Sequence, residues 1–369
     1  MKFADIEKLE SYVEQGYLTK RPHPTLPLFV YNYTDKTTWE KKWDDVTIMC
    51  RGLVLDKEYN IIARPFKKFF NQGETEEVRE FPNEPCEATI KLDGSLGIAF
   101  KYNDNYIVST RGSFESEQSK WATDYFNENG YSDPTYKAFL PEYTYLFEII
   151  YKANKIIVDY DYQGLVLIGM VNIETGDEMP YNMLFNEAER LKIRVVDPVI
   201  GQTPIELINK ANTTPASLLE GFVLWFPKSQ LRIKIKGEQY RKLAKFISNL
   251  SPLALWESME SGKVRDAFYN DCPIEFLGMA KEIGNKLEEQ YADLLTRIRH
   301  CWDSIPIETK RGPRKDFALY VKDQYGGRMG YMFRYLDFKP MNDMLMKEIR
   351  PTKNIINGFD IMGQKREEV

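Results

Sequence analysis

The segment KLDGS at residues 91–95 is the part of this 369-residue chain that most clearly indicates a chemical role. Its lysine, Lys91, leaves a strand-like run and enters a tight Asp-Gly turn. A lysine amine acts as a nucleophile only when it is neutral, and its reference pKa is about 10.4. Positive charge or burial nearby would lower that pKa. We expect Lys234 and Lys236 to supply such charge, because the alternating segment RIKIK places both on one strand face.

Two carboxylates and further cations stand where strands are expected to begin or end. Glu148 interrupts the apolar run LFEII, and Glu220 precedes GFVLWF. Burial of either carboxylate without a partner would be costly. The cations are Arg51, Lys68 and Arg111, in addition to Lys234 and Lys236. Each residue alone is also explained by a hairpin turn or a salt bridge at a strand edge. Together they concentrate positive charge that needs an anionic partner.

The elements that must position these residues change in kind along the chain. Residues 1–240 are dominated by short β-branched and aromatic runs between hairpin-like turns, with helical patterns at 116–129 and 180–192. This mixture predicts an α+β fold built on antiparallel sheets. From about Glu238 helical periodicity takes over, and the longest helix is expected at 273–302. We therefore predict two domains, 1–245 and 246–369.

Composition excludes several classes of protein. The chain is 43% hydrophobic, which suffices for a sizeable core. No apolar run approaches the roughly 18 residues that span a membrane, and the first residues mix charged with apolar side chains, so we expect neither a spanning helix nor a signal peptide. Four scattered cysteines without a CxxC pair, and only two histidines, argue against a zinc site, a disulfide framework and a histidine-based triad. We expect a reduced, cytoplasmic protein.

The charge distribution leaves room for a local nucleic-acid patch only. The net charge of −5 excludes a simple polybasic binder, yet residues 241–369 hold 22 Lys and Arg against 19 Asp and Glu. Within them, the segment KRGPRK at 310–315 is either a grip for RNA phosphates or a solvated linker.

Taken in order, the charged segments resemble the motif set of the covalent nucleotidyltransferases, which are the polynucleotide ligases and RNA-capping enzymes. The matching segments are KLDGS (91–95), STRGSF (109–114), FEII (147–150), EGFVLWF (220–226) and RIKIK (232–236). Within that superfamily the chain is most similar to the bacteriophage T4 RNA ligase 1 family. The segments that carry this resemblance are YNY (31–33), CRGLVL (50–55), RPFKKFFN (64–71) and NKIIVDY (154–160).

The resemblance implies an ATP-dependent RNA ligase. Such an enzyme joins a 3′-hydroxyl end to a 5′-phosphate end through a covalent lysyl-AMP, here on Lys91, and an adenylylated RNA 5′ end. It implies Mg²⁺ or Mn²⁺, and bound Mg²⁺ would act with Lys234 and Lys236 to lower the pKa of Lys91. It implies a nucleotidyltransferase domain of ATP-grasp-like fold, and a helical C-terminal domain with a role in RNA specificity. It also implies a function in repair of RNA or tRNA.

The resemblance also implies a set of site residues. The residues expected to bind ATP are Tyr31, Arg51, Lys68, Ile90, Arg111, Glu148, Glu220, Lys234 and Lys236. Tyr31, Arg51 and Lys68 would contact phosphates, and the backbone around Ile90 would contact the adenine edge. Glu148, Glu220 and Asp266 would serve the metal. Arg111 stands where the family often has lysine, so that a planar fork replaces a point charge.

Partners and alternatives follow from the same resemblance. We expect a monomer that acts on single-stranded RNA or a broken tRNA loop, without a membrane partner, and that is compatible with a separate end-healing kinase-phosphatase. One alternative is a DNA ligase or a capping-type nucleotidyltransferase, against which the lack of an RxDK-type motif argues. Another is a non-catalytic RNA-binding relative, against which the complete motif set argues. The sequence contains neither a P-loop nor an HxD cluster, which argues against a kinase or a phosphatase.

Overall fold

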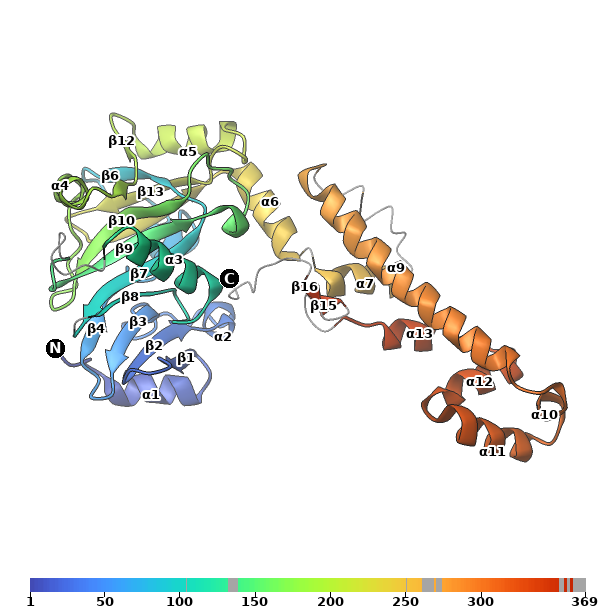
Figure 1. Cartoon of the computed structure of the whole chain (residues 1–369). Coiled ribbons are helices and arrows are strands. Elements are labelled where there is room, and N and C mark those ends of the chain that lie inside the picture. The colour runs from blue at the N-terminus through green and yellow to red at the C-terminus, as the bar shows by residue number, and fades with distance from the viewer. Residues whose placement is uncertain are drawn as a thin grey trace. The chain divides into compact units, whose positions relative to one another are not determined.

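The computed structural model describes residues 1–103, 105–131, 139–249, 251–260, 269, 274–351, 355–356 and 359–360. The chain forms two compact units, Met1–Lys242 and Leu243–Gly363 (Figure 1). The assignment of separate roles to domains 1–245 and 246–369 stays a prediction.

The first sheet of the N-terminal unit follows the order of the chain. Its strands are β1 (Leu18–Pro22), β2 (Leu28–Tyr33), β3 (Arg51–Asp56) and β4 (Ile61–Ala63), and all neighbours are antiparallel. Helix α1 (Ile6–Glu14) begins after Asp5, whose side chain accepts a hydrogen bond from the Lys8 backbone at 3.0 Å. Leu9 of this helix is buried with Leu18 and Leu53 of the sheet.

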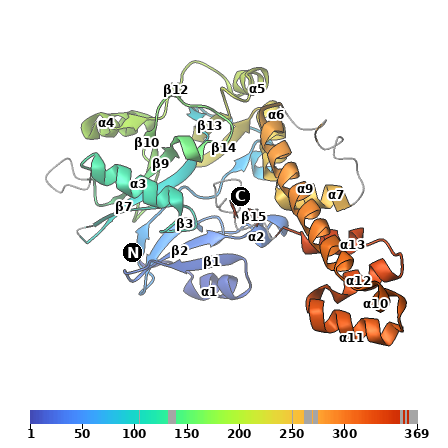
Figure 2. The ribbon, with the colours of Figure 1, turned by 45° about the vertical axis from the view of Figure 1, so that its right-hand side comes forward.

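The second sheet has the strand order β11-β10-β9-β7-β8. Its strands are β7 (Ser95–Tyr102), β8 (Asn105–Ser109), β9 (Tyr143–Ile150), β10 (Gly164–Asn172) and β11 (Arg194–Val195). Helices α3 (Glu117–Glu128) and α4 (Tyr181–Leu191) cover one face, where Phe126 and Leu184 pack with Phe147 (Figure 1, Figure 2). Leu146, which precedes Phe147 on β9, faces the opposite side of the sheet and packs with Val54 of the first sheet.

The third sheet has the strand order β12-β6-β13-β14-β5. Its strands are β5 (Phe70–Asn71), β6 (Glu87–Lys91), β12 (Pro198–Val199), β13 (Gly221–Phe226) and β14 (Leu231–Lys236). Helix α5 (Pro204–Thr213), which the sequence analysis did not predict, begins with a Thr203–Glu206 capping box and packs Leu207 against Phe222. The remaining short elements of this unit are α2 (Asp35–Trp39), η1 (Glu76–Val78) and η2 (Lys152–Asn154).

The α+β fold and the helices at 116–129 and 180–192 are confirmed, but the sheets are not purely antiparallel. Strand β11 runs parallel to β10, and β5 runs parallel to β14. Both are two-residue strands at a sheet edge, whose direction is set by long connections rather than by a hairpin turn.

The C-terminal unit is mostly helical, as predicted. Its helices are α6 (Glu238–Asn249), which crosses the division, α7 (Pro252–Glu260), α9 (Ile274–Asp303), α10 (Ile307–Arg311), α11 (Arg314–Tyr325), η3 (Gly326–Arg328), α12 (Met329–Leu336) and α13 (Asn342–Glu348). A short antiparallel pair, β15 (Ile355–Ile356) with β16 (Phe359–Asp360), was not expected.

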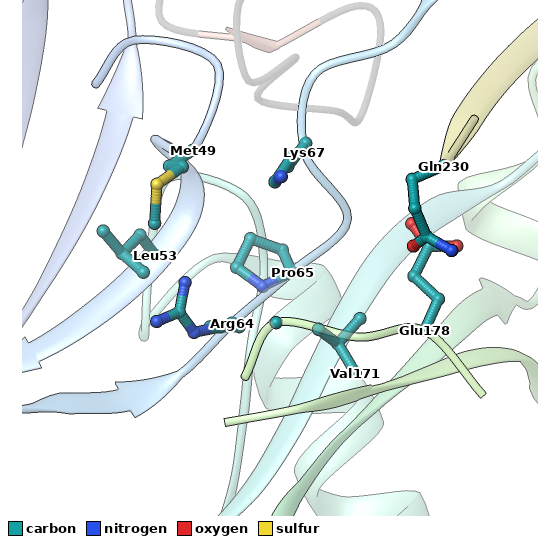
Figure 3. Close-up of a pocket in the computed structure, with 9 residues that line it drawn as sticks. Met49, Leu53, Arg64, Pro65, Lys67, Val171, Glu178 and Gln230 are labelled. Atoms are coloured by element: carbon teal, nitrogen blue, oxygen red, sulfur yellow. The ribbon is translucent and has the colours of Figure 1, made fainter. Parts of the chain in front are cut away.

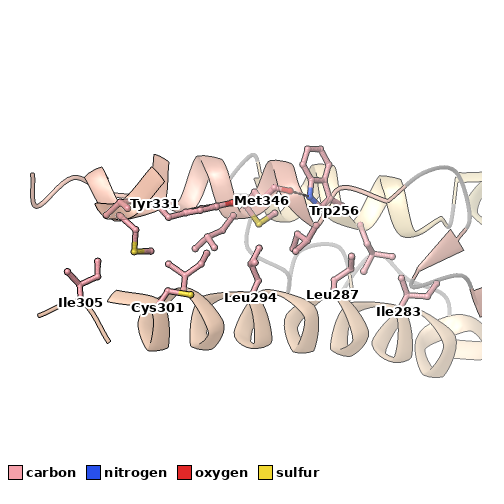
Figure 4. Packing of buried hydrophobic residues seen from close by; sticks show 14 of the residues in the cluster. Trp256, Ile283, Leu287, Leu294, Cys301, Ile305, Tyr331 and Met346 are labelled. Atoms are coloured by element: carbon pink, nitrogen blue, oxygen red, sulfur yellow. Dashed lines mark hydrogen bonds between the residues drawn. The ribbon is translucent and has the colours of Figure 1, made fainter. Parts of the chain in front are cut away.

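One long helix organises this second core. Ile283, Leu287 and Leu294 lie on one side of α9 and are buried (Figure 4). Trp256 of α7 is buried with them, and its ring nitrogen donates a hydrogen bond to the Met346 carbonyl at 2.8 Å. Among the described residues, no helix combines the length and apolarity needed to cross a membrane.

Candidate active site

Three neighbouring strands bring Lys91, Glu220 and Lys236 together. Gly221 on β13 pairs with Lys91 on β6 and with Lys236 on β14, so the two lysines flank the start of β13. Glu220 immediately precedes Gly221 and reaches between them. A Cβ atom at Gly221 would lie 1.9 Å from the Ile235 carbonyl oxygen, so only glycine allows these strands to approach so closely.

Glu220 uses one carboxylate oxygen for each lysine. Oε2 accepts a hydrogen bond from Lys91 Nζ at 2.8 Å, and Oε1 lies 2.9 Å from Lys236 Nζ. The Glu220 side chain is only 3% exposed. Burial raises the pKa of Glu220, but the charges of Lys91 and Lys236 outweigh it and hold that pKa below its ordinary value. Glu220 is therefore ionised, and it pairs with the predicted nucleophile.

Lys234 and Lys236 by themselves do not lower the pKa of Lys91 below its ordinary value, and the share expected from a bound Mg²⁺ stays a prediction. Burial lowers the pKa of Lys91, yet the charges of Glu220 and Glu148, with that of Asp93, outweigh burial and raise the pKa above its ordinary value. Lys234 and Lys236 do not reverse this balance. Lys91 is held as an ammonium ion, so activation requires that these carboxylates be neutralised.

Glu148 on β9 lies beneath the turn that follows Lys91. Its Oε1 accepts a hydrogen bond from the Gly94 backbone at 2.9 Å. A Cβ atom at Gly94 would lie 2.6 Å from the Ile149 carbonyl oxygen, which explains the glycine of the KLDGS segment. Burial raises the pKa of Glu148 to about 7; Lys91 opposes this rise, and Glu220 and Asp93 add to it.

A divalent cation fits this environment. Glu148 is a partly buried carboxylate whose ionised form the protein's own cations do not stabilise fully, which is the deficit that an oxygen-seeking ion would fill. Within the described residues there is no group of three or more His, Cys, Asp or Glu arranged to hold a metal ion. The third predicted ligand, Asp266, lies outside those residues.

Asp93 has a positioning role that the sequence analysis missed. The side chain is buried, and its Oδ2 accepts hydrogen bonds from the backbones of Ile157 and Val158, each at 2.8 Å. Its Oδ1 accepts one from the Tyr240 hydroxyl at 2.6 Å. Its own backbone donates to the Tyr160 hydroxyl at 2.7 Å. Asp93 thus ties the turn after Lys91 to the 157–160 segment and to α6.

A second group of side chains gathers around Tyr33. The Arg111 Nη1 lies 3.4 Å from the Tyr33 hydroxyl, and the Lys68 ammonium lies 5.6 Å from the Tyr33 ring centre. Burial raises the pKa of Tyr33, but the charges of Arg51, Arg111 and Lys68 outweigh it, so that pKa lies below its ordinary value. A partly buried phenol with a lowered pKa indicates a local excess of positive charge.

Gly52 explains how two arginines reach the same place. The pairing of β2 with β3 shifts between Tyr31 and Asn32, opposite Gly52, which has a φ of +99°. Such a bulge redirects the adjacent side chain, here that of Arg51. A Cβ atom at Gly52 would lie 3.2 Å from the Arg111 Cα, so glycine also allows the two segments to pack closely.

Lys234 joins the two groups electrostatically. Its ammonium lies 4.7 Å from the Phe69 ring centre, and among the described residues it has no salt bridge. Burial lowers the pKa of Lys234 well below its ordinary value, and the charges of Arg51 and Lys68, then Lys91 and Lys236, lower it further. Repulsion from residues of both groups shows that they form one positively charged site.

Tyr31 lies apart from the charged side chains around Tyr33, and contact of the backbone around Ile90 with the adenine edge stays a prediction. The Tyr31 hydroxyl donates to Glu10 at 2.9 Å. The geometry favours Tyr33, two residues further on, as the tyrosine of the site. The Ile90 backbone amide donates to the Asp197 carbonyl at 3.0 Å and is already engaged.

Two residues of the basic segment 310–315 in the C-terminal unit already contact other side chains of the protein. The Lys310 ammonium lies 4.8 Å from the Trp302 ring centre. Arg314 donates to Asp337 through both terminal nitrogens, at 2.6 and 2.9 Å. Their role in gripping RNA stays a prediction.

Comparison with known proteins identifies the family. The sequence model of the RNA ligases of the T4 RNA ligase 1 type matches residues 49–240, which is more than half of the chain. The chain belongs to the T4 RNA ligase 1 family. As a member it is an RNA ligase, and the matched region contains Lys91, Glu148, Glu220 and Lys236.

Two relatives of this RNA ligase differ in how much they share with it. An RNA ligase of Rhodothermus phage RM378 is 24% identical over 86% of both chains. A protein of Autographa californica nuclear polyhedrosis virus, whose name combines polynucleotide kinase with RNA ligase, is 28% identical over 59% of this chain and 33% of its own.

Among solved structures, the chain is similar to an archaeal ATP-dependent RNA ligase, with a TM-score of 0.46 and 14% identity over 90% of this chain and 96% of that one. It is also similar to a Naegleria gruberi RNA ligase variant with ATP and Mn, with a TM-score of 0.36 and 16% identity over 46% of this chain and 54% of that one.

Proposed function

We propose that this RNA ligase uses ATP to join a 3′-hydroxyl RNA end to a 5′-phosphate end through a lysyl-AMP on Lys91. One observation carries the proposal: a partly buried lysine, Lys91, is paired with Glu220 beside a set of cations that repel one another. Lys234 and Lys68 lie against aromatic rings rather than carboxylates, so their charge remains available. A polyanion such as a triphosphate would relieve this repulsion.

In the first step, the neutral Lys91 amine attacks the α-phosphorus of ATP. A nitrogen–phosphorus bond forms, the bond to the leaving oxygen breaks, and pyrophosphate departs with its electron pair. Lys236 and Lys234 would stabilise the charge that develops on the phosphate oxygens. A cation held by Glu148 and Glu220 would lower the pKa of Lys91, because it neutralises the carboxylates that raise it.

In the later steps, AMP passes from Lys91 to the RNA 5′-phosphate, and the 3′-hydroxyl oxygen then attacks that phosphate and expels AMP. Arg51, Lys68 and Lys234 would hold phosphate oxygens throughout, and Lys91 would return to its Glu220 contact. We propose Mg²⁺ or Mn²⁺ as the cation, and an ATP-grasp-like fold for the domain at 1–245.

The biological setting is proposed to be repair of broken RNA or tRNA. The viral relative whose name combines a kinase with a ligase supports the view that end healing accompanies end joining. In the present chain a separate kinase-phosphatase would perform that healing. A role for domain 246–369 in choosing RNA, a monomeric state and a cytoplasmic location remain predictions of the same proposal.

The test uses the full chain with radiolabelled ATP or GTP and Mg²⁺. We expect label to remain on the protein in a denaturing gel with ATP alone. Label from GTP would indicate a capping-type enzyme, and no label would favour a non-catalytic relative. A 5′-phosphorylated single-stranded RNA should then be circularised or joined, in parallel with a nicked DNA duplex that should not be sealed.

A further inference from the structure

A second basic pocket lies in the N-terminal unit, apart from Lys91 and Glu220. It is lined by two segments that also serve the active site: Met49 and Leu53 flank Arg51, and Arg64, Pro65 and Lys67 precede Lys68 (Figure 3). Glu178 and Gln230 close the side opposite Met49 and Leu53.

Arg64 is the unusual feature of this pocket. The residue is only 9% exposed, and among the described residues no carboxylate lies within salt-bridge distance of its guanidinium. Nε donates to the Ile173 carbonyl at 2.6 Å, and Nη2 has a weak contact with the Glu174 carbonyl at 3.5 Å. Within the part of the chain that the structure describes, no acceptor lies within hydrogen-bond distance of Nη1. A guanidinium carries five N–H donors, so both donors of Nη1 are left for a ligand in the pocket.

The balance of charge favours an anion. Lys67 is exposed and adds a second positive charge to the lining. The one lining carboxylate, Glu178, is paired with Arg232, whose guanidinium lies 4.1 Å from the Phe66 ring centre. Burial also lowers the pKa of Arg64, which is the expected effect of a charge without an anionic partner.

The remaining walls are apolar. Met49, Leu53, Pro65 and Val171 contribute hydrocarbon surface beside the two cations. One anionic group next to an apolar body is the chemistry of a nucleotide within a strand, whose phosphate would bind Arg64 and Lys67 and whose sugar would lie beside Met49, the half-buried apolar residue of the lining.

We propose that this pocket binds a phosphodiester of the RNA substrate, close to the reacting end. This inference rests on the proposed ligase function. Consecutive residues place it there: Lys68 belongs to the cations of the active site, and Lys67 belongs to the pocket. A strand whose end is held by Lys68 and Arg51 can therefore continue over Pro65 into the pocket.

The test compares two variants of the full chain with a matched control. Lys67→Glu reverses an exposed charge in the pocket, and Arg64→Lys keeps the charge but removes the fork of donors. Lys57→Glu is the control, because Lys57 is an exposed lysine in the β3–β4 turn that does not line the pocket. Each protein is measured for self-adenylylation and for binding of a 5′-phosphorylated single-stranded RNA across a salt series.

We expect Lys67→Glu to weaken RNA binding about tenfold and to reduce the slope of log affinity against log salt by about one, because one phosphate contact is lost. Self-adenylylation should stay within twofold of the parent, and Lys57→Glu should bind as the parent does. Unchanged RNA affinity in both pocket variants would overturn the proposal.

Inorganic phosphate supplies a second arm. If phosphate alone raises the melting temperature in a Lys67-dependent manner while RNA affinity is unchanged, the pocket serves a free anion and the RNA assignment is wrong. Failure of the ligase function itself would be seen separately, as absence of lysyl-AMP in the parent protein.

Discussion

The ammonium of Lys91 lies 2.8 Å from Oε2 of Glu220, across two neighbouring strands. The contact stabilises the protonated lysine, which cannot attack phosphorus. The pair therefore keeps the nucleophile charged until other charges enter the site.

This pair predicts a pH effect of Glu220→Gln. The charge of Glu220 raises the pKa of Lys91, so its removal should move the rise of the adenylylation rate with pH toward lower pH. The maximal rate should also fall, because Lys236 loses its partner. Single-turnover labelling at saturating ATP measures both effects. Lys91→Ala, which should form no adduct yet still seal RNA that already carries a 5′-adenylate, is the control. An unchanged pH profile would show that Glu220 does not control Lys91.

A change at Lys234 should improve stability and impair function. Its pKa lies well below the ordinary value because of burial and neighbouring cations, so its charge opposes folding at pH 7. Lys234→Met should raise the melting temperature at pH 7 and lower adenylylation about 10²–10³-fold, as for loss of one donor to a developing charge. Lys228→Met, in the exposed turn of the same hairpin, is the control. A lower melting temperature would contradict this reading of Lys234.

Glu148 should make stability depend on pH. Burial raises its pKa to about 7, while an unfolded glutamate titrates near ~4.3. Between these values the folded state binds more protons than the unfolded state, so the free energy of unfolding falls as pH rises.

Glu148→Gln removes this dependence and keeps an acceptor for Gly94. Without divalent ions, we expect its melting temperature to exceed that of the parent at pH 8 and to match it near pH 4. Mg²⁺ should raise the melting temperature of the parent more than that of the variant. Glu142→Gln, an exposed glutamate just before β9, serves as the control. Equal melting temperatures at pH 8 would refute the assignment.

Tyr240→Phe should affect both stability and adenylylation. The change leaves Asp93 Oδ1 without the hydroxyl that donates to it at 2.6 Å. A buried acceptor that loses its donor costs about 1–3 kcal/mol, and urea unfolding measures this cost. A slower adenylylation in the folded variant would support positioning of the Lys91 turn by Asp93; an unchanged rate at reduced stability would limit Tyr240 to a structural role.

A fragment of residues 1–251 should form the lysyl-AMP without joining RNA efficiently. It includes the N-terminal unit and all of α6, whose Tyr240 contacts Asp93. We expect weaker RNA binding, since residues 252–369 are absent. Circular dichroism establishes that the fragment folds. A folded fragment that fails to react with ATP would assign part of the ATP site, with Asp266 as a candidate, to the C-terminal unit.

Local patterns predicted much of the fold. Period-two alternation identified the β14 strand with Lys234 and Lys236, and helical periodicity identified α3, α4 and α9. Such signals are carried by neighbouring residues and survive in an isolated sequence. The directions of β5 and β11 could not be predicted from the sequence. A two-residue strand has no periodicity, and its direction is set by the strand with which it pairs.

The errors in the site have a similar origin. Tyr31 and Tyr33 lie two positions apart on β2 and contact the same core cluster, so strand periodicity does not distinguish them. In the sequence, Asp93 is indistinguishable from an ordinary turn residue. Its positioning role is hidden because its hydrogen-bond partners lie 64, 65 and 147 positions away. The sign of the Lys91 pKa shift depends on how near Glu220 and Glu148 approach, and sequence spacing does not encode that distance.

The aromatic residues around Lys68 make the intrinsic fluorescence of Trp43 sensitive to ligand binding. The Lys68 ammonium lies 5.2 Å from the ring centre of Trp43, which also meets the rings of Tyr33 and Phe70 edge-on. A phosphate that draws this ammonium away changes the electric field at the indole, and with it the colour and intensity of tryptophan emission. Ligand occupancy can therefore be followed by fluorescence without a label, and Trp43→Phe identifies the signal among the six tryptophans of the chain.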